Sequence, residues 1–183
     1  MTTWLHDLRL QSVLEAISES GAASVIDLGC GDGDLLLRLV REPQIRRVVG
    51  VDIDRAALDR LRARLDTSEA KTEVTLVERS MTECGRDLAG FDCAVLLETI
   101  EHLDPERLSV LERSLFSFMR PRTAIITTPN AEFNELLGVP PHRFRHPGHR
   151  FEWDREKFRR WAEGVARRNG YTMIHRDIAG QHP

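Results

Sequence analysis

The sequence has no apolar run of about 18 residues, so we expect no membrane span and no membrane partner. Its amino-terminal residues also lack a secretory pattern. Cysteine is scarce, and the spacing of Cys30, Cys84 and Cys93 is unlike that of a zinc site. Cys30 and Cys93 fall in apolar contexts at strand ends, where buried thiols are typical. We therefore expect a cytoplasmic, reducing location and a single domain over residues 1–183.

Strong net charge is absent as well. The formal charge is −3, which argues against a uniformly basic nucleic-acid-binding protein. Positive charge is instead local: residues 140–176 hold ten basic and four acidic side chains, a charge of +6 that leaves −9 for the rest of the chain. This basic segment predicts a surface that meets phosphate. For residues 155–168 a solvated helix face is the alternative that we favour.

Apolar strand patterns alternate with amphipathic helix patterns along the chain. We predict helices over 5–17, 35–40, 56–65, 105–119 and 155–169. We predict strands over 23–28, 47–51, 74–77, 91–97, 123–128 and 171–178. This alternation predicts an α/β fold with a doubly wound, mostly parallel sheet. The sequence holds no seventh strand that returns antiparallel, so we expect a bare sheet edge or a chain that is part of a longer protein.

A glycine-rich turn follows the first predicted strand. The stretch Asp27–Gly33 reads Asp-Leu-Gly-Cys-Gly-Asp-Gly and leads into a helix. Glycines allow a sharp turn and the close approach of a ligand to the backbone. Asp52 ends the second predicted strand, 23 residues after Gly29, where an acid can accept hydrogen bonds from both hydroxyls of a ribose. We therefore predict a site for an adenosine-type cofactor, with the adenine edge near Ser80 and Met81. We favour this interpretation over the alternative, in which the turn is purely structural.

Two carboxylates and an imidazole follow the fourth predicted strand. Glu98, Glu101 and His102 stand at positions i, i+3 and i+4, which places them on one face of a helical turn. They form most of a metal site, and the alternative is a solvated turn. Because ligands gather at the carboxyl ends of parallel strands, we favour the metal site. Any of the histidines in the irregular segment 129–153 could complete it, namely His142, His146 and His149.

These motifs resemble the methyltransferase domain of the Hen1 family, the small-RNA 3′-terminal 2′-O-methyltransferases. The glycine turn is common to many S-adenosylmethionine-dependent methyltransferases. More specific are Glu98-Thr99-Ile100-Glu101-His102, Thr128-Pro129-Asn130-Ala131-Glu132-Phe133-Asn134 and His149-Arg150-Phe151-Glu152-Trp153. The resemblance implies a class I, Rossmann-like methyltransferase fold that binds S-adenosylmethionine and manganese or another divalent cation.

The resemblance also implies roles for individual residues. The metal ligands would be Glu98, Glu101, His102 and His149, with His146 as the competitor for the fourth place. The cofactor site would comprise Asp27, Gly29, Gly31, Gly33, Asp52, Ser80 and Met81. The terminal phosphates and nucleotide of the RNA would meet Arg9, Asn130, Arg143, Arg145 and Arg150. On composition alone, Arg9 would be an ordinary exposed charge on the first helix.

Four protein ligands leave about two positions of an octahedron, which the vicinal 2′ and 3′ oxygens of a terminal ribose would fill. We therefore expect methylation of the 2′-hydroxyl at the 3′ end of RNA. Bacterial relatives act beside an RNA end-healing and ligating repair protein, so such a partner is implied. Two alternatives stay open: a metal-independent methyltransferase acting on a small molecule or protein, and a catalytically silent module that binds RNA or a nucleotide.

Overall fold

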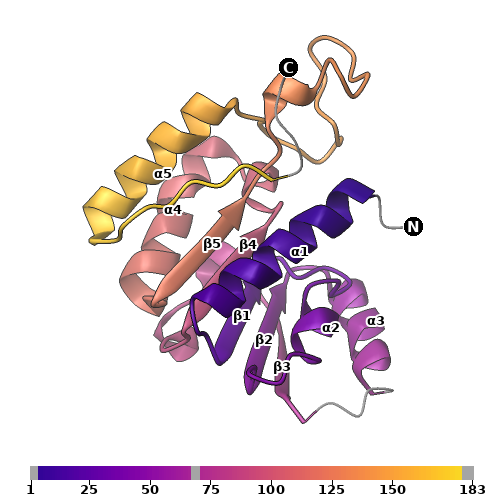
Figure 1. Ribbon diagram of the computed structural model, residues 1–183, viewed down its shortest axis with the longest axis vertical. Helices are drawn as coiled ribbons and strands as arrows, with labels where there is room; N and C mark the ends of the chain where they lie inside the picture. Colours follow the sequence, from indigo (N-terminus) through magenta and orange to yellow (C-terminus); the bar gives the residue numbers. More distant parts are fainter. Residues whose placement is uncertain (1–3, 67–70, 179–183) are drawn as a thin grey trace.

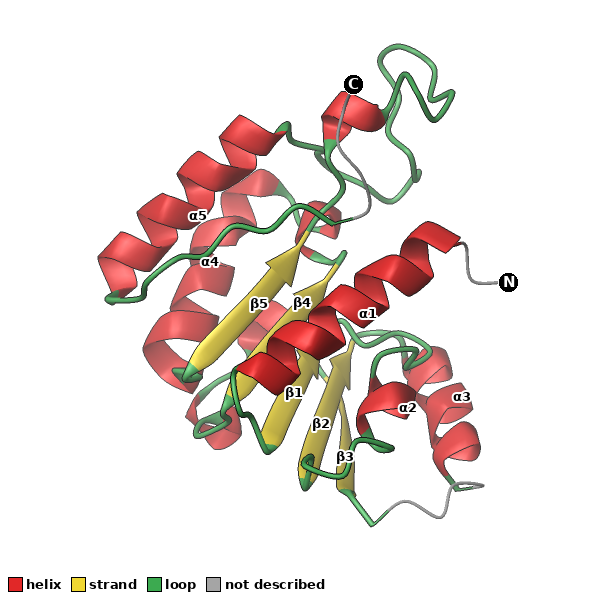
Figure 2. Cartoon of the chain, viewed as in Figure 1, coloured by secondary structure: helices red, strands yellow, loops and turns green. Residues whose placement is uncertain are grey.

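The computed structural model describes residues 4–66 and 71–178 and contains one five-stranded parallel sheet of order β3-β2-β1-β4-β5 (Figure 2). The strands are β1 (Ser24–Leu28), β2 (Arg47–Asp52), β3 (Glu73–Glu78), β4 (Cys93–Leu97) and β5 (Thr123–Thr127). The helices are α1 (Trp4–Glu19), α2 (Leu36–Leu39), α3 (Arg55–Leu65), α4 (Leu108–Glu112) and α5 (Arg155–Asn169). The predicted doubly wound α/β fold is confirmed.

Alternation along the buried strands divides the core between the two faces of the sheet. In β1, Val25 packs into a core with α1, α2 and α3, whereas its neighbour Ile26 packs into a core with α4 and α5. Because both faces are covered, the central strands are apolar along nearly their whole length. Figure 1 shows α5 alongside α4, with α1 crossing the sheet.

The carboxyl ends of β1, β2 and β4 meet at one edge of the sheet. Strand β1 pairs with β2 on one side and with β4 on the other, so the strand order reverses beside β1. In doubly wound sheets the crevice at such a reversal is where ligands bind. The glycine turn begins at the end of β1, Asp52 is the last residue of β2, and Glu98 directly follows β4. The fold therefore brings these predicted site residues to one edge.

The predicted sixth strand at 171–178 is wrong, because these residues pair with no strand of the sheet. Side-chain contacts hold the segment in place. The hydroxyl of Tyr171 donates to the Pro121 carbonyl at 2.5 Å, and Arg176 forms an ion pair with Glu19 on α1 at 2.5 Å. An alternating pattern describes an extended backbone, but a strand also needs a hydrogen-bonding partner.

Two helix predictions also change in detail. The predicted helix over 105–119 begins as a 3-10 turn, continues as α4, and ends as a π-helix over Arg113–Met119. Asp104 occupies its N-cap position without a side-chain capping hydrogen bond. The predicted helix over 35–40 is shortened to α2. By contrast, Asp154 caps α5 as predicted, accepting from the Lys157 N–H at 2.7 Å.

The three cysteines are buried and free, which confirms buried thiols at Cys30 and Cys93. Across the described ranges, every helix is too short or too polar to cross a membrane.

Candidate functional site

The glycine turn after β1 has the backbone that its sequence predicts. Gly29, Gly31 and Gly33 have φ values of 81°, 51° and 82°, in the left-handed region that favours glycine. A β-carbon on Gly29 would lie 2.5 Å from Thr99 Cγ2, so the turn packs directly against the segment that follows β4. The N–H groups of Gly29 and Cys30 both donate to the Val51 carbonyl, which ties the turn to β2.

Two aspartates lie under this turn. Asp52 accepts from the Gly31 N–H at 2.7 Å through Oδ2 and from the Asp54 N–H at 2.8 Å through Oδ1. Asp27 is 2% exposed. Burial, assisted by the neighbouring Asp52 charge, raises the pKa of Asp27 to about 7. The two carboxylates predicted to serve the cofactor are therefore brought together at the ends of adjacent strands.

Of the two residues predicted to lie at the adenine edge, Met81 reaches this turn. Ser80 caps the short 3-10 helix Met81–Glu83, accepting from the Thr82 N–H. The Met81 side chain comes within 3.7 Å of the position of a β-carbon on Gly29. All seven predicted cofactor residues thus lie around one edge of the sheet, and their contacts with a cofactor stay a prediction.

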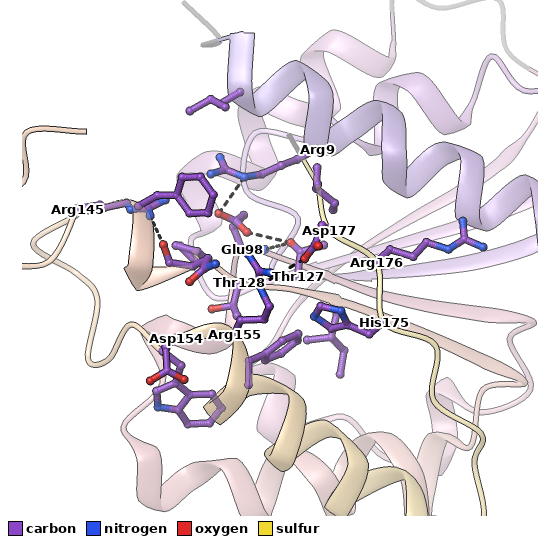
Figure 3. A pocket seen from close by; sticks show the side chains of 18 of the residues that line it. Arg9, Glu98, Thr127, Thr128, Arg145, Asp154, Arg155, His175, Arg176 and Asp177 are labelled. Atoms are coloured by element: carbon purple, nitrogen blue, oxygen red, sulfur yellow. Dashed lines mark hydrogen bonds and ion pairs between the residues drawn. The ribbon is translucent and has the colours of Figure 1, made fainter. Parts of the chain in front are cut away.

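Glu98 connects β4, β5 and α1. Its φ of 53° turns the chain sharply at the end of β4, and its N–H donates to Thr127 Oγ1 at 3.0 Å. The Thr127 hydroxyl donates back to Glu98 Oε1 at 3.1 Å. Arg9 Nε lies 3.4 Å from Glu98 Oε2 (Figure 3). Burial raises the pKa of Glu98 from its ordinary value, and the Arg9 charge opposes that shift.

Glu101 is fully buried on the 3-10 turn Ile100–His102. Its Oε2 accepts from the Thr128 hydroxyl at 3.2 Å, whereas its Oε1 has no hydrogen-bond partner among the described residues. Burial and then the nearby Glu98 charge raise the pKa of Glu101 to about 8. An unpaired buried carboxylate oxygen is unfavourable unless a proton or a cation compensates it. This oxygen therefore fits a cation.

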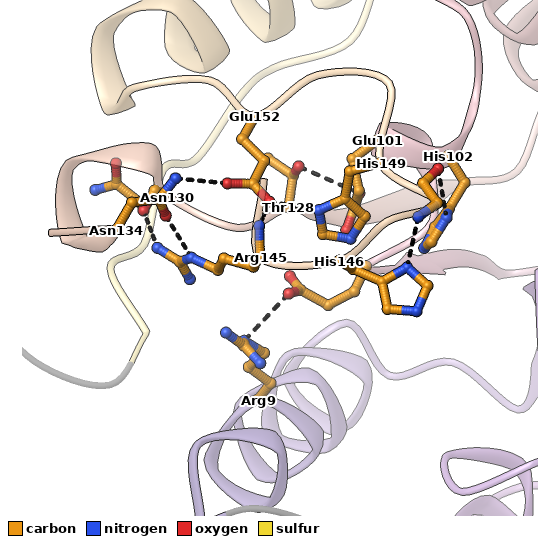
Figure 4. A network of polar contacts seen from close by, with 12 residues as sticks. Arg9, Glu101, His102, Thr128, Asn130, Asn134, Arg145, His146, His149 and Glu152 are labelled. Carbon is orange, nitrogen blue, oxygen red and sulfur yellow. Dashed lines mark hydrogen bonds and ion pairs between the residues drawn. The ribbon is translucent and has the colours of Figure 1, made fainter. Parts of the chain in front are cut away.

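Three histidines meet beside these carboxylates. The ligand atoms of His102, His146 and His149 all lie within 4.8 Å of one another. Glu98 and Glu101 are outside this trio, and Figure 4 shows Glu101 in the same polar network as the three histidines. His142, the remaining histidine of the predicted loop, is exposed and also lies outside the trio.

Hydrogen bonds to Nδ1 assign the neutral tautomers of the three rings. His102 Nδ1 lies 3.2 Å from the Gly148 carbonyl, and His149 Nδ1 lies 2.5 Å from Glu152 Oε1. Because both partners are acceptors, each Nδ1 carries the proton and each Nε2 keeps a lone pair. His146 is the reverse: its Nδ1 accepts from the Gly148 N–H at 3.0 Å, so in the neutral ring Nε2 carries the proton. Two rings can thus ligate through Nε2, and the third presents a donor there.

Three of the five residues predicted to bind RNA line one pocket. Arg9, Asn130 and Arg145 surround a cavity of about 190 Å³ at the end of β5, together with Glu98 (Figure 3). Arg145 donates through Nε to Asn134 Oδ1 at 2.5 Å and through its terminal nitrogen to the Asn130 carbonyl.

The other two predicted RNA residues do not line this pocket. Arg143 is exposed on the loop. Arg150 donates its backbone N–H to the Glu101 carbonyl at 2.7 Å, and its exposed side chain lies 3.6 Å from Asp104.

The prediction of site residues missed several polar partners that hold these groups in place. They are Thr127, Thr128, Asn134, Gly148 and Glu152. Glu152 follows His149 by three residues in the motif His149-Arg150-Phe151-Glu152-Trp153. This spacing could have indicated that the two side chains interact.

Comparisons with known proteins show which family the chain belongs to. Residues 25–122 match the family described as "Methyltransferase domain". The small RNA 2′-O-methyltransferase of Xenopus tropicalis is 38% identical over 177 residues, which are 92% of this chain and 48% of that protein. The chain thus spans about half the length of the curated relatives in vertebrates that it matches.

Two solved structures are similar over nearly the whole chain. The methyltransferase domain of bacterial CtHen1 has a TM-score of 0.84 and 35% identity, covering 96% of this chain and 91% of that one. The small RNA methyltransferase HEN1 has a TM-score of 0.83 and 34% identity, covering 92% of this chain and 22% of that one. The chain therefore belongs to the Hen1 family of methyltransferase domains.

Proposed function

We propose that this domain transfers a methyl group from S-adenosylmethionine to the 2′-hydroxyl of the 3′-terminal nucleotide of RNA and that the transfer depends on manganese or another divalent cation. The observation that carries the proposal is the contact between Gly29 and Thr99. This contact brings the glycine turn against the segment that bears Glu98, Glu101 and His102. A methyl donor bound at the turn would therefore lie beside a hydroxyl held at the acid-histidine cluster, and positioning of this kind accounts for much of the rate in group transfer.

Four side chains would hold the cation: Glu98, Glu101, His102 and His149. The donor set of two carboxylates and two imidazoles suits manganese and related divalent ions. The unpaired Glu101 Oε1 and the free Nε2 lone pairs of His102 and His149 are the features that fit it. A cation bound there would lower the pKa of the attacking hydroxyl and hold charge that develops on its oxygen. This set of four protein donors would leave room for the vicinal oxygens of a terminal ribose.

His149 is favoured over His146 as the fourth ligand because of the tautomers described above. Ligation through Nε2 of His146 would require loss of its proton or of the Gly148 hydrogen bond. His149 keeps its Nε2 lone pair while Glu152 fixes the ring. Such a carboxylate partner on the far nitrogen is common for histidines that ligate metals.

The chain's own residues would bind the two substrates. Asp52 would accept hydrogen bonds from the ribose of S-adenosylmethionine, with Asp27 behind it. The guanidinium groups of Arg9 and Arg145 would bind the terminal phosphates, and Asn130 would contact the terminal nucleotide. A 2′-O-methylated end would suit RNA repair beside an end-healing and ligating protein, which is the partner that the family resemblance implies.

One experiment tests this function against its alternatives. Methyl transfer from labelled S-adenosylmethionine to a short RNA should be observed with manganese and lost with a chelator. Transfer to a protein or small molecule that is insensitive to the chelator would instead indicate a metal-independent methyltransferase. Binding of RNA and cofactor without transfer under any metal condition would indicate a silent binding module.

A further inference from the structure

Glu152 is a buried carboxylate whose role in the proposed reaction is limited to orienting the His149 ring. Its side chain is 1% exposed, and it follows Phe151 on the returning arm of the long loop. Each of its oxygens accepts hydrogen bonds: Oε1 from the Arg145 N–H at 2.7 Å and from His149 Nδ1 at 2.5 Å, and Oε2 from Asn134 Nδ2 at 2.7 Å. Burial disfavours its charged form, but these hydrogen bonds hold the pKa of Glu152 below its ordinary value.

The contacts of Glu152 lead in two directions. On one side, Glu152 accepts from Nδ1 of His149, whose ring lies with those of His102 and His146. On the other side, Asn134 Oδ1 accepts a hydrogen bond from Arg145 Nε. Arg145 lines the same pocket as Arg9. Figure 4 shows Glu152 between Asn134 and His149. A single side chain therefore joins a metal-site histidine to a predicted phosphate-binding arginine.

We propose that Glu152 is a positioning residue that couples the divalent-cation site to the phosphate-binding pocket, so that occupation of either site strengthens binding at the other. This inference rests on the proposed function for the identity of the two ligands. Ordering of the His149 ring and of the Arg145 guanidinium depends on the same carboxylate, so a ligand that orders one side lowers the free energy needed to order the other. Such a coupling is reciprocal, since it is a free energy shared by two binding equilibria.

Only a carboxylate satisfies all of these donors. A glutamine at position 152 could place its amide oxygen where Oε1 accepts from His149 and the Arg145 N–H. Its amide nitrogen would then face the Asn134 amide nitrogen, a donor against a donor. If Asn134 rotated to accept, its nitrogen would face Arg145 Nε instead. Glu152→Gln thus keeps the shape of the side chain and breaks the connection between the cation site and the phosphate-binding pocket.

The test measures binding and does not require turnover. Free Mn²⁺ is quantified by electron paramagnetic resonance during titration of the full chain, with and without an oligonucleotide that ends in a 2′,3′-dideoxynucleotide. This probe carries terminal phosphates but lacks the hydroxyls that could ligate the ion, so any coupling passes through the protein. Oligonucleotide affinity is measured in parallel with and without Mn²⁺.

Three variants test whether Glu152 connects the cation site to the phosphate-binding pocket. In the wild type we expect the probe to tighten Mn²⁺ binding several-fold. Glu152→Gln should reduce this effect to near one-fold, and Asn134→Ala should do the same while leaving Mn²⁺ affinity without the probe unchanged. Glu156→Gln, an exposed glutamate on α5, is the matched control and should behave as the wild type. If Glu152→Gln fails to fold by circular dichroism, the Asn134→Ala result decides.

The inference is overturned if the wild type shows no coupling, or if the coupling persists in Glu152→Gln and Asn134→Ala. Failure of the proposed function is a separate result. A wild type that binds no Mn²⁺ would remove the proposed metal site, whereas a protein that shows the coupling but methylates no RNA would lose only the proposed reaction.

Discussion

Arg9 Nε on α1 lies 3.4 Å from Glu98 Oε2 at the end of β4, so a cation from the first helix faces the first proposed metal ligand. Arg9→Ala should leave S-adenosylmethionine binding unchanged and weaken RNA binding, because a phosphate contact is lost. The slope of log affinity against log salt concentration should become less steep by about 0.9, the value for one phosphate contact. The control is Arg62→Ala, an exposed arginine on α3 that pairs with Asp59. An unchanged salt slope would mean that Arg9 pairs with Glu98 and does not contact a phosphate.

Asp52→Ala should weaken S-adenosylmethionine binding by roughly 10- to 100-fold, since a hydrogen bond to a charged acceptor contributes about 1.5–3 kcal/mol. Its loss would also release the Gly31 N–H, which loosens the turn. Calorimetric titration measures the effect. Asp59→Ala, an exposed aspartate on α3, is the control. Equal affinity for Asp52→Ala and the wild type would place the ribose elsewhere.

His149→Ala should abolish manganese-dependent transfer and weaken Mn²⁺ binding, because four donors become three. His146→Ala should leave Mn²⁺ affinity close to that of the wild type, since its Nε2 carries the proton in the neutral ring. Both quantities are measured on the same preparations. The reverse pattern, with His146 essential and His149 dispensable, would exchange the two assignments.

Asp27 should make the stability of the cofactor-free protein depend on pH. Its pKa of about 7 lies above the ordinary value because the side chain is buried, so the folded state binds more protons than the unfolded state between about pH 4 and pH 7. The free energy of unfolding should therefore fall across this range by up to about 1.4 kcal/mol per pH unit from this group, and level off above it. Asp27→Asn removes the titration. Urea unfolding of both proteins from about pH 5 to pH 8 should give a difference that changes with pH, and a constant difference would contradict the assignment.

RNA with free 2′ and 3′ terminal hydroxyls should be methylated on the 2′ oxygen, whereas RNA ending in 3′-deoxy or 3′-phosphate should be a poor substrate. The reason is the number of donors: four from the protein leave two positions for one ribose. Methyl incorporation into three oligonucleotides that differ only at the 3′ group, at saturating manganese, provides the comparison. Equal rates on all three would leave the acid-histidine cluster as a single-point contact or a structural feature.

Local sequence chemistry was sufficient for the parallel sheet and for the edge at which the site lies. Strand runs, the glycine turn and Asp52 are readable because the conformational preferences of glycine and the periodicity of apolar residues act over a few neighbouring residues. Glu98, Glu101 and His102 could be chosen because they follow a strand closely in the sequence. The single helical turn predicted for them is wrong, since Glu98 has a φ of 53° and only residues 100–102 form a 3-10 turn. The segment 171–178 was misassigned because its extended pattern lacked information about a pairing partner.

Packing between distant segments decided the remainder. His149 lies 47 residues from His102 in the chain, yet their rings are 4.8 Å apart. The different tautomers of His146 and His149 depend on Gly148 and Glu152, and the unpaired oxygen of Glu101 depends on what the fold buries around it. Hydrogen-bond partners and burial are set by contacts across the whole domain, and a pattern of residue types along the chain does not contain them.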